Sequence, residues 1–78
     1  MNKTARDKLH SVIKEVLGVE IADDLSMNTV SSWDSLRHLQ LMAKIEEEFG
    51  LELDFKDTLA MTSLKSIVTV LEKYVGQK

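Results

Sequence analysis

An apolar period of three to four residues recurs in three separate stretches of this 78-residue chain, and no other feature limits its fold as strongly. Such a period is the repeat of an α-helix that has one apolar face. The apolar positions are Ala5, Leu9, Val12, Ile13, Val16 and Leu17 in the first stretch, Leu36, Leu39, Met42, Ala43, Ile45 and Phe49 (with Leu41 beside them) in the second, and Leu64, Ile67, Val68, Leu71 and Val75 in the third. Three faces of this kind can close one small core.

Capping residues flank these stretches and predict where each helix begins and ends. Thr4, with Asp7 three positions on, resembles a capping box and would begin the first helix. Asp34 and Ser35 suit the start of the second helix, because a short oxygen-bearing side chain accepts hydrogen bonds from first-turn N–H groups. The remaining signals are Ser63 or Thr62 at the start of the last helix, and the stops Gly18, Gly50 and Gly76.

Two segments lack the helical period. Residues 18–34 form a long loop, which would be pinned to the core by Ile21, Leu25, Val30 and the anchor Trp33. Residues 51–54 alternate apolar and acidic side chains, but a lone strand has no partner in a helical chain, so we expect an extended connector. A short helix over about residues 55–60 would follow, capped by Asp54. The predicted fold class is all-α: a small four-helix bundle with three long helices, a short third helix and a long loop between helices one and two, in one domain over residues 1–78.

Composition excludes several kinds of function. Without cysteine, the chain has no disulfide, no thiolate metal ligand and no thiol nucleophile of its own. Its two histidines, His10 and His38, stand at no recognisable metal-ligand spacing, so no metal is expected. A formal net charge of -3 argues against nucleic acid and favours basic protein partners. No apolar run approaches the ~20 residues of a membrane span, and the N-terminal residues carry no secretion signal, so we expect a cytoplasmic location.

Ser35 is the side chain of greatest chemical interest, because a serine at a helix N-terminus lies near the surface beside free N–H donors. The partial positive charge at that end tolerates a phosphate ester on the hydroxyl. The plainer reading is that Ser35 only caps the helix, and for an isolated Asp-Ser-Leu tripeptide it is the commoner one.

The order of elements resembles an acyl carrier protein. The likeness rests on an amphipathic first helix, a long loop, the run WDSL at residues 33–36, and a second helix that closes with IEEEF at residues 45–49. The connector and the last two helices continue it over nearly the whole chain. The resemblance implies that Ser35, preceded by Asp34, carries a 4′-phosphopantetheine arm donated by coenzyme A and attached by a separate phosphopantetheinyl transferase. The thiol of this arm would hold acyl or aminoacyl groups as thioesters, and the domain itself would catalyse nothing.

The same resemblance implies a surface for the enzymes that load or accept the acyl group. The partner-binding residues would be the apolar strip Leu36, Leu39 and Ala43, the polar neighbours Arg37, Gln40, Glu46 and Glu47, and Met61. Met61 has a second interpretation, as ordinary core filling. The residues expected to face the core are Leu41, Ile45 and Phe49.

Two features depart from the carriers of bulk fatty acid synthesis. The first turns of the second helix carry Arg37, His38, Gln40 and Lys44, and a tryptophan precedes Asp-Ser-Leu. Both features indicate a specialised pathway, such as polyketide, peptide or sugar-modifying biosynthesis.

A helical adaptor without a prosthetic group is the alternative function, and an adaptor needs no hydroxyl at Ser35. An enzyme is disfavoured, because the chain offers no paired general acid and base and little volume for a substrate cleft. His38 lies one turn after Ser35, where i, i+3 neighbours can meet, but we expect a surface histidine rather than a base that activates Ser35. We also expect a monomer.

Overall fold

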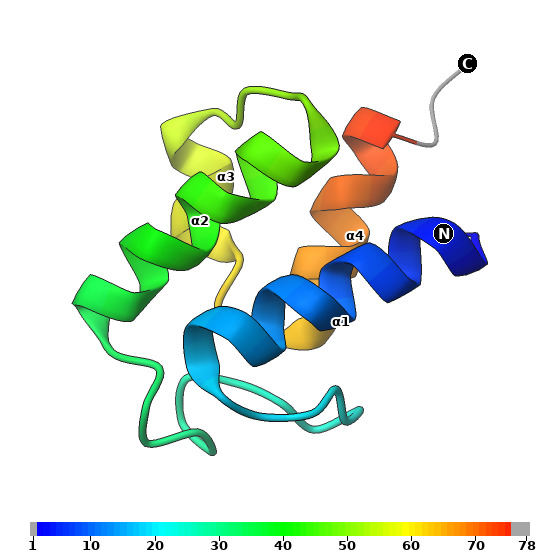
Figure 1. Ribbon diagram of the computed structural model, residues 1–78. Coiled ribbons are helices and arrows are strands. Elements are labelled where there is room, and N and C mark those ends of the chain that lie inside the picture. Colours follow the sequence, from blue (N-terminus) through cyan, green and yellow to red (C-terminus); the bar gives the residue numbers. More distant parts are fainter. Residues whose placement is uncertain (1, 76–78) are drawn as a thin grey trace.

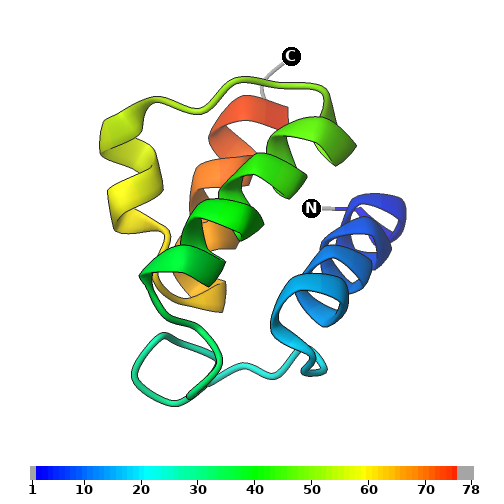
Figure 2. The same cartoon turned by 60° about the vertical axis from the view of Figure 1, so that its left-hand side comes forward.

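The computed structural model describes residues 2–75, which form four α-helices joined by loops. The helices are α1 (Lys3–Leu17), α2 (Ser35–Phe49), α3 (Phe55–Ala60) and α4 (Leu64–Val75). The long loop between α1 and α2 crosses one end of the molecule (Figure 1). In a second view, α2 and α4 stand between α1 and the short α3 (Figure 2). The predicted all-α bundle of three long helices and one short one is confirmed.

The core draws on all three long helices, as their apolar periods predicted. Its buried helical side chains include Leu9, Val12, Ile13 and Leu17 of α1, Leu41, Met42 and Ile45 of α2, and Leu64, Ile67, Val70 and Leu71 of α4. The loop contributes Leu25, Val30 and Trp33, and the segment after α3 contributes Met61. Each fully buried apolar side chain contributes about 1.5–3 kcal/mol, so the loop is held by the same force as the helices.

The first helix begins earlier than predicted. Its cap is Asn2, whose side-chain Oδ1 accepts the Ala5 N–H at 2.8 Å. Asparagine and threonine are both good caps, and Asn2 satisfies a first-turn donor two residues before Thr4, which leaves Thr4 inside the helix. The prediction of Thr4 as the cap is therefore wrong. Helices α2 and α3 begin and end as expected, but the prediction that Asp54 caps α3 is only half right, because Asp54 stands at the N-cap position and its side chain makes no capping hydrogen bond.

Two glycines end α1 and α2 in the left-handed region of backbone space. Gly18 has φ 74° and Gly50 has φ 64°, and each donates its N–H to a carbonyl of the preceding helix. Glycine takes this conformation without the steric penalty that other residues meet. At the start of α4, the Ser63 hydroxyl oxygen accepts the Ser66 N–H at 3.2 Å, so of the two alternatives for this cap Ser63 is the right one. The stop predicted at Gly76 lies outside the described residues.

The long loop is paired with the connection between α3 and α4. The Met27 N–H donates to the Thr62 carbonyl at 3.0 Å, and the Leu64 N–H donates to the Leu25 carbonyl at 2.9 Å. Trp33, at the end of the loop, is 2% exposed, which confirms its role as an anchor. The chain therefore enters α2 from a fixed point.

The described residues contain neither a membrane-spanning helix nor a cluster of metal-binding side chains. Across residues 2–75, no helix is both long and apolar enough to cross a lipid bilayer. Within the same range, no three His, Asp or Glu side chains lie together where they could hold a metal ion.

Candidate functional site

Ser35 is the first residue of α2, and its side chain is exposed. The cap of this helix is the preceding residue: Asp34 Oδ1 accepts the Arg37 N–H at 2.9 Å, and the Asp34 carbonyl accepts the His38 N–H at 2.8 Å. Asp34 thus performs the task that the plainer reading assigned to Ser35. The Ser35 hydroxyl is left at the surface, at the positive end of a 15-residue helix.

Two apolar hollows, each of about 330 Å³, lie between α2 and α3. The hollow that adjoins Ser35 is also lined by Met27, His38, Leu39, Leu59 and Thr62. The other lies further along α2, where its apolar lining is Leu39, Met42, Ala43, Leu53, Phe55 and Leu59. An exposed hydroxyl at a helix N-terminus fits a phosphate-linked group such as 4′-phosphopantetheine, and the adjoining hollow offers apolar surface beside the attachment point.

His38 is held on both sides and is not the surface histidine that the sequence led us to expect. The Trp33 Nε1–H donates to His38 Nδ1 at 3.0 Å, and His38 Nε2 lies 2.7 Å from the Thr58 carbonyl oxygen. An indole N–H can only donate and a carbonyl can only accept, so the imidazole is the neutral tautomer with its proton on Nε2. Because both ring nitrogens are used, neither is free to act as a base on Ser35.

Among the described residues, the large exposed apolar side chains all belong to α2 and α3. Leu36 and Leu39 are 64% and 67% exposed, and Ala43 beside them is exposed as well. Phe55 and Leu59 of α3 are 75% and 61% exposed, and the sequence did not indicate that these two side chains would lie at the surface. Their i, i+4 spacing places both on one face of α3, but the same spacing is found on core faces.

Met61 belongs to the core and is 0% exposed. Core filling is therefore the right interpretation of Met61, and a partner contact is wrong. The chain leaves α3 at this residue and turns toward α4, which places the side chain inside the molecule. Leu41 and Ile45 are fully buried as expected, whereas Phe49 is only half-buried, with the Lys8 ammonium 5.4 Å from its ring centroid.

Two polar residues of the predicted partner surface also hold the fold. The Arg37 guanidinium donates to the Val16 carbonyl at 2.6 Å, in the last turn of α1. Glu46 Oε2 accepts the Leu53 N–H at 2.8 Å and so fixes the connector before α3. The other two polar residues of that surface, Gln40 and Glu47, are exposed.

The positive charge of Lys44 is balanced within the molecule. Its ammonium lies 3.4 Å from Glu15 of α1, 3.6 Å from Glu47 and 3.8 Å from Glu48. The hydrogen bond to Glu15, followed by the negative charges of Glu15 and Glu47, raises the pKa of Lys44 above its ordinary value. Lys44 consequently presents less positive charge to a partner than the sequence alone indicates.

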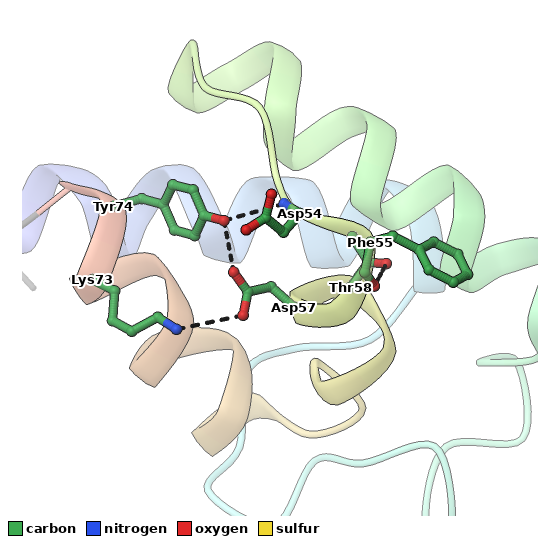
Figure 3. Close-up of polar contacts among 6 residues, drawn as sticks. All are labelled: Asp54, Phe55, Asp57, Thr58, Lys73 and Tyr74. Atoms are coloured by element: carbon green, nitrogen blue, oxygen red, sulfur yellow. Dashed lines mark hydrogen bonds and ion pairs between the residues drawn. The ribbon is translucent and has the colours of Figure 1, made fainter.

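A second polar cluster ties α3 to α4 (Figure 3). The Tyr74 O–H donates to Asp57 Oδ2 at 2.6 Å and its oxygen accepts the Asp54 N–H at 3.1 Å, while Lys73 Nζ lies 3.4 Å from Asp57 Oδ1. The hydrogen bond from Tyr74, helped by Lys73, lowers the pKa of Asp57. The Asp54 N–H favours ionised Tyr74, but the Asp57 carboxylate and burial outweigh it, so the pKa of Tyr74 is raised.

Known proteins match this chain over most of its length. A family model described as the phosphopantetheine attachment site matches residues 7–71. An acyl carrier protein of Thermotoga maritima is 31% identical over 72 residues, which cover 88% of this chain and 89% of that protein. An acyl carrier protein of Buchnera aphidicola subsp. Baizongia pistaciae is 30% identical over 71 residues, which cover 87% of this chain and 91% of that protein.

Proposed function

The chain belongs to the acyl carrier protein family, and on that premise we propose that Ser35 is the residue to which its 4′-phosphopantetheine is attached. The protein is a carrier and not an enzyme. When attached, the 4′-phosphopantetheine supplies a terminal thiol on which an acyl group is held as a thioester. Its partners are therefore the phosphopantetheinyl transferase and the enzymes that load or accept the acyl group.

The assignment of Ser35 rests on the different roles of Asp34 and Ser35 at the start of α2. Asp34 caps the helix, so the Ser35 hydroxyl remains exposed at the helix N-terminus. A negative charge there is stabilised by about 0.3–1 kcal/mol at an exposed site. In the attachment step, the Ser35 oxygen forms a bond to the pantetheine phosphorus of coenzyme A. The bond from that phosphorus to the adenosine bisphosphate leaving group breaks, and the hydroxyl proton passes to a base of the transferase.

Intact-mass measurement tests this assignment. We expect the purified apo protein, incubated with coenzyme A and a broad-specificity phosphopantetheinyl transferase, to gain the mass of one phosphopantetheine. Ser35→Ala should gain none. Ser31→Ala is the matched control, since Ser31 is an exposed serine in the adjacent loop, and it should be modified like the wild type. Modification of Ser35→Ala would move the site to another residue, and a folded wild-type protein that stays unmodified by several transferases would contradict the proposal.

The partner surface that we propose joins the exposed strip of α2 to the exposed face of α3. Its apolar centre is formed by Leu36 and Leu39 together with Phe55 and Leu59, close to Ser35. Exposed apolar side chains that gather on one side of a small protein mark an interaction site. The acyl-handling enzymes must reach the arm on Ser35, and this surface lies where they would approach it.

A specialised pathway is the proposed setting for this carrier, rather than bulk fatty acid synthesis. Arg37 is exposed in the first turn of α2, and Lys56 lies exposed on α3. A partner built for a uniformly acidic surface offers Arg and Lys, which would meet these cations, and like charges suppress wrong partners.

A further inference from the structure

The hollow that adjoins Ser35 lies along the face of α2 on which the serine itself stands. Ser35, His38 and Leu39 all line this hollow, and residues three and four positions apart share one side of a helix. A group attached to the Ser35 oxygen therefore begins beside the hollow, and its first atoms meet this surface before any other part of the molecule.

Another part of the lining comes from two segments that are hydrogen-bonded to each other. The loop supplies Met27, and the connection between α3 and α4 supplies Thr62. The Met27 N–H donates to the Thr62 carbonyl at 3.0 Å, which fixes the two residues relative to each other. Leu59, near the end of α3, completes the lining. Because the tie between the two segments is made by the backbone, it does not depend on either side chain.

The Thr62 hydroxyl is the side-chain group of the lining, apart from Ser35, that can still form a hydrogen bond. Both ring nitrogens of His38 are already used, one by the Trp33 indole and the other by a carbonyl of α3. Thr62 is exposed, and no group within residues 2–75 bonds to its hydroxyl. The remaining lining residues are apolar. The hollow thus offers apolar surface, one available hydroxyl and no charged side chain.

We propose that this hollow is a binding site for the pantoyl part of the 4′-phosphopantetheine arm, and that Thr62 positions it there. The pantoyl part follows the phosphate directly and carries two methyl groups on one carbon, then a hydroxyl group and an amide. The methyl groups suit the apolar side chains of Met27 and Leu59, and the Thr62 hydroxyl can bond to the pantoyl hydroxyl or the amide. This pantoyl site requires an arm on Ser35, so it rests on the proposed function.

The pantoyl site should hold the arm reversibly. Burial of one CH₂ group shifts an equilibrium about fourfold, and the pantoyl part has two methyl groups to bury. One hydrogen bond adds a factor of roughly two to ten. The cost of ordering the arm offsets part of both gains. A site of this strength keeps the arm beside α2 and α3 between transfers, and an enzyme that binds the arm can still withdraw it.

Isotope-filtered nuclear magnetic resonance of the holo protein tests the site directly. The ¹³C-labelled apo protein is converted with unlabelled coenzyme A, and its gain in mass confirms that one arm is attached. We expect nuclear Overhauser contacts from the two methyl groups of the arm to the methyl groups of Met27 and Leu59. A holo protein without these contacts, in which the arm methyl signals stand where they do in free pantetheine, would overturn the proposal.

Variants of Thr62 test the hydrogen bond. Thr62→Val keeps the branched shape but removes the hydroxyl, so the ratio of held to free arm should fall roughly two- to tenfold. This ratio is measured from the arm methyl shifts and the intensities of their contacts. Thr62→Ser keeps the hydroxyl and should stay close to the wild type. An unchanged ratio in Thr62→Val would overturn the assignment of Thr62 as the positioning residue.

Thr4→Val is the matched control for Thr62→Val. Thr4 is also an exposed threonine, but it lies on α1 and does not line the hollow, so its replacement should leave the ratio unchanged. Met27→Ala tests the apolar part of the site and should also lower the ratio. It leaves the backbone bond between Met27 and Thr62 in place, so the hollow should keep its outline.

The pantoyl site and the proposed function fail separately in this experiment. A protein that gains no mass, or that gains it at a residue other than Ser35, contradicts the proposed function. A protein that carries the arm on Ser35, but whose arm makes no contact with Met27 or Leu59, contradicts the pantoyl site alone.

Discussion

Leu59 and Met61 are close neighbours in the chain, but one lies at the surface and the other in the core. Leu59 is 61% exposed and Met61 is 0% exposed. Met61→Ala should therefore lower the free energy of unfolding by about 2–5 kcal/mol. Leu59→Ala removes a side chain of similar size but should change that free energy by less than about 0.5 kcal/mol. Urea denaturation of both variants measures the difference, and equal losses would mean that Met61 is not a core residue.

Hydrogen bonding distinguishes Ser35 from most other serines of the chain. The hydroxyls of Ser26, Ser32, Ser63 and Ser66 all take part in hydrogen bonds that hold loops or helix starts. Ser11 and Ser31 are exposed, but one lies in the middle of α1 and the other in the loop. Ser35 combines exposure with a helix N-terminus whose capping is performed by Asp34. This combination is what a phosphate ester at the surface requires.

At the scale of the elements, α3 is held to α4 by a bond whose contribution depends on pH. The hydrogen bond from Tyr74 is the main cause of the lowered pKa of Asp57. A lowered folded-state pKa contributes stability that is present above the ordinary titration range of aspartate, near about pH 4, and lost as the pH falls through the lowered value. Tyr74→Phe should therefore be less stable than wild type at neutral pH, and the difference should shrink in acid. Thermal unfolding of both proteins across this range measures it.

Asp57→Asn provides the control for the Tyr74→Phe measurement, because it removes the titrating group and keeps the size of the side chain. Its stability relative to wild type should also be most reduced at neutral pH. At alkaline pH the effect of Tyr74 on stability has the opposite dependence on pH, because its pKa is raised and not lowered. The stability that Tyr74 contributes is present below about pH 10 and is lost as the pH rises through the raised pKa. A difference between wild type and Tyr74→Phe that does not vary with pH would mean that the bond from the Asp54 N–H to the Tyr74 oxygen, rather than the bond to Asp57, accounts for the loss of stability.

The whole molecule has a net charge of -3, and neighbouring carboxylates largely balance the positive charge of one of the two cationic side chains of α2. Lys44 lies within 4 Å of three carboxylates, from Glu15 on α1 and from Glu47 and Glu48 on α2. Arg37 donates to a carbonyl at the end of α1, which carries only a partial negative charge. The positive charge that an approaching partner meets near Ser35 is therefore mainly that of Arg37.

Partner choice should follow this charge distribution. We predict that the pantetheinylated protein is a poor substrate for enzymes of bulk fatty acid synthesis, and that reversing the α2 cations improves it. Arg37→Asp should contribute more of the gain than Lys44→Glu, because Lys44 is already balanced. The gain should be larger at low ionic strength, where exposed charges are less screened. Measurements of kcat/KM at low and high salt test this. Efficient turnover of the wild type, unchanged by either substitution, would show that these cations do not set partner choice.

The sequence by itself determined the parts of this protein that depend on local chemistry. An apolar period and a cap act over a few residues, so they were enough to predict the bounds of α2 and α3, the stops at Gly18 and Gly50, and the place of Ser35 at a helix start. The cap of α1 was missed because Asn2 and Thr4 are both capable of capping and differ little in free energy.

Only the tertiary structure decided which apolar faces meet the core and which polar groups meet each other. A period shows that Phe55 and Leu59 share a face of α3, but the positions of α2 and α4 decide that this face is exposed while Met61 is buried. His38 meets Thr58, and Lys44 meets Glu15, across separations in the chain that no local pattern encodes. Such contacts depend on how the helices are placed around a shared core. The hydrophobic effect that buries the core is non-directional, so it does not select polar partners; the final positions of the helices decide which polar groups meet.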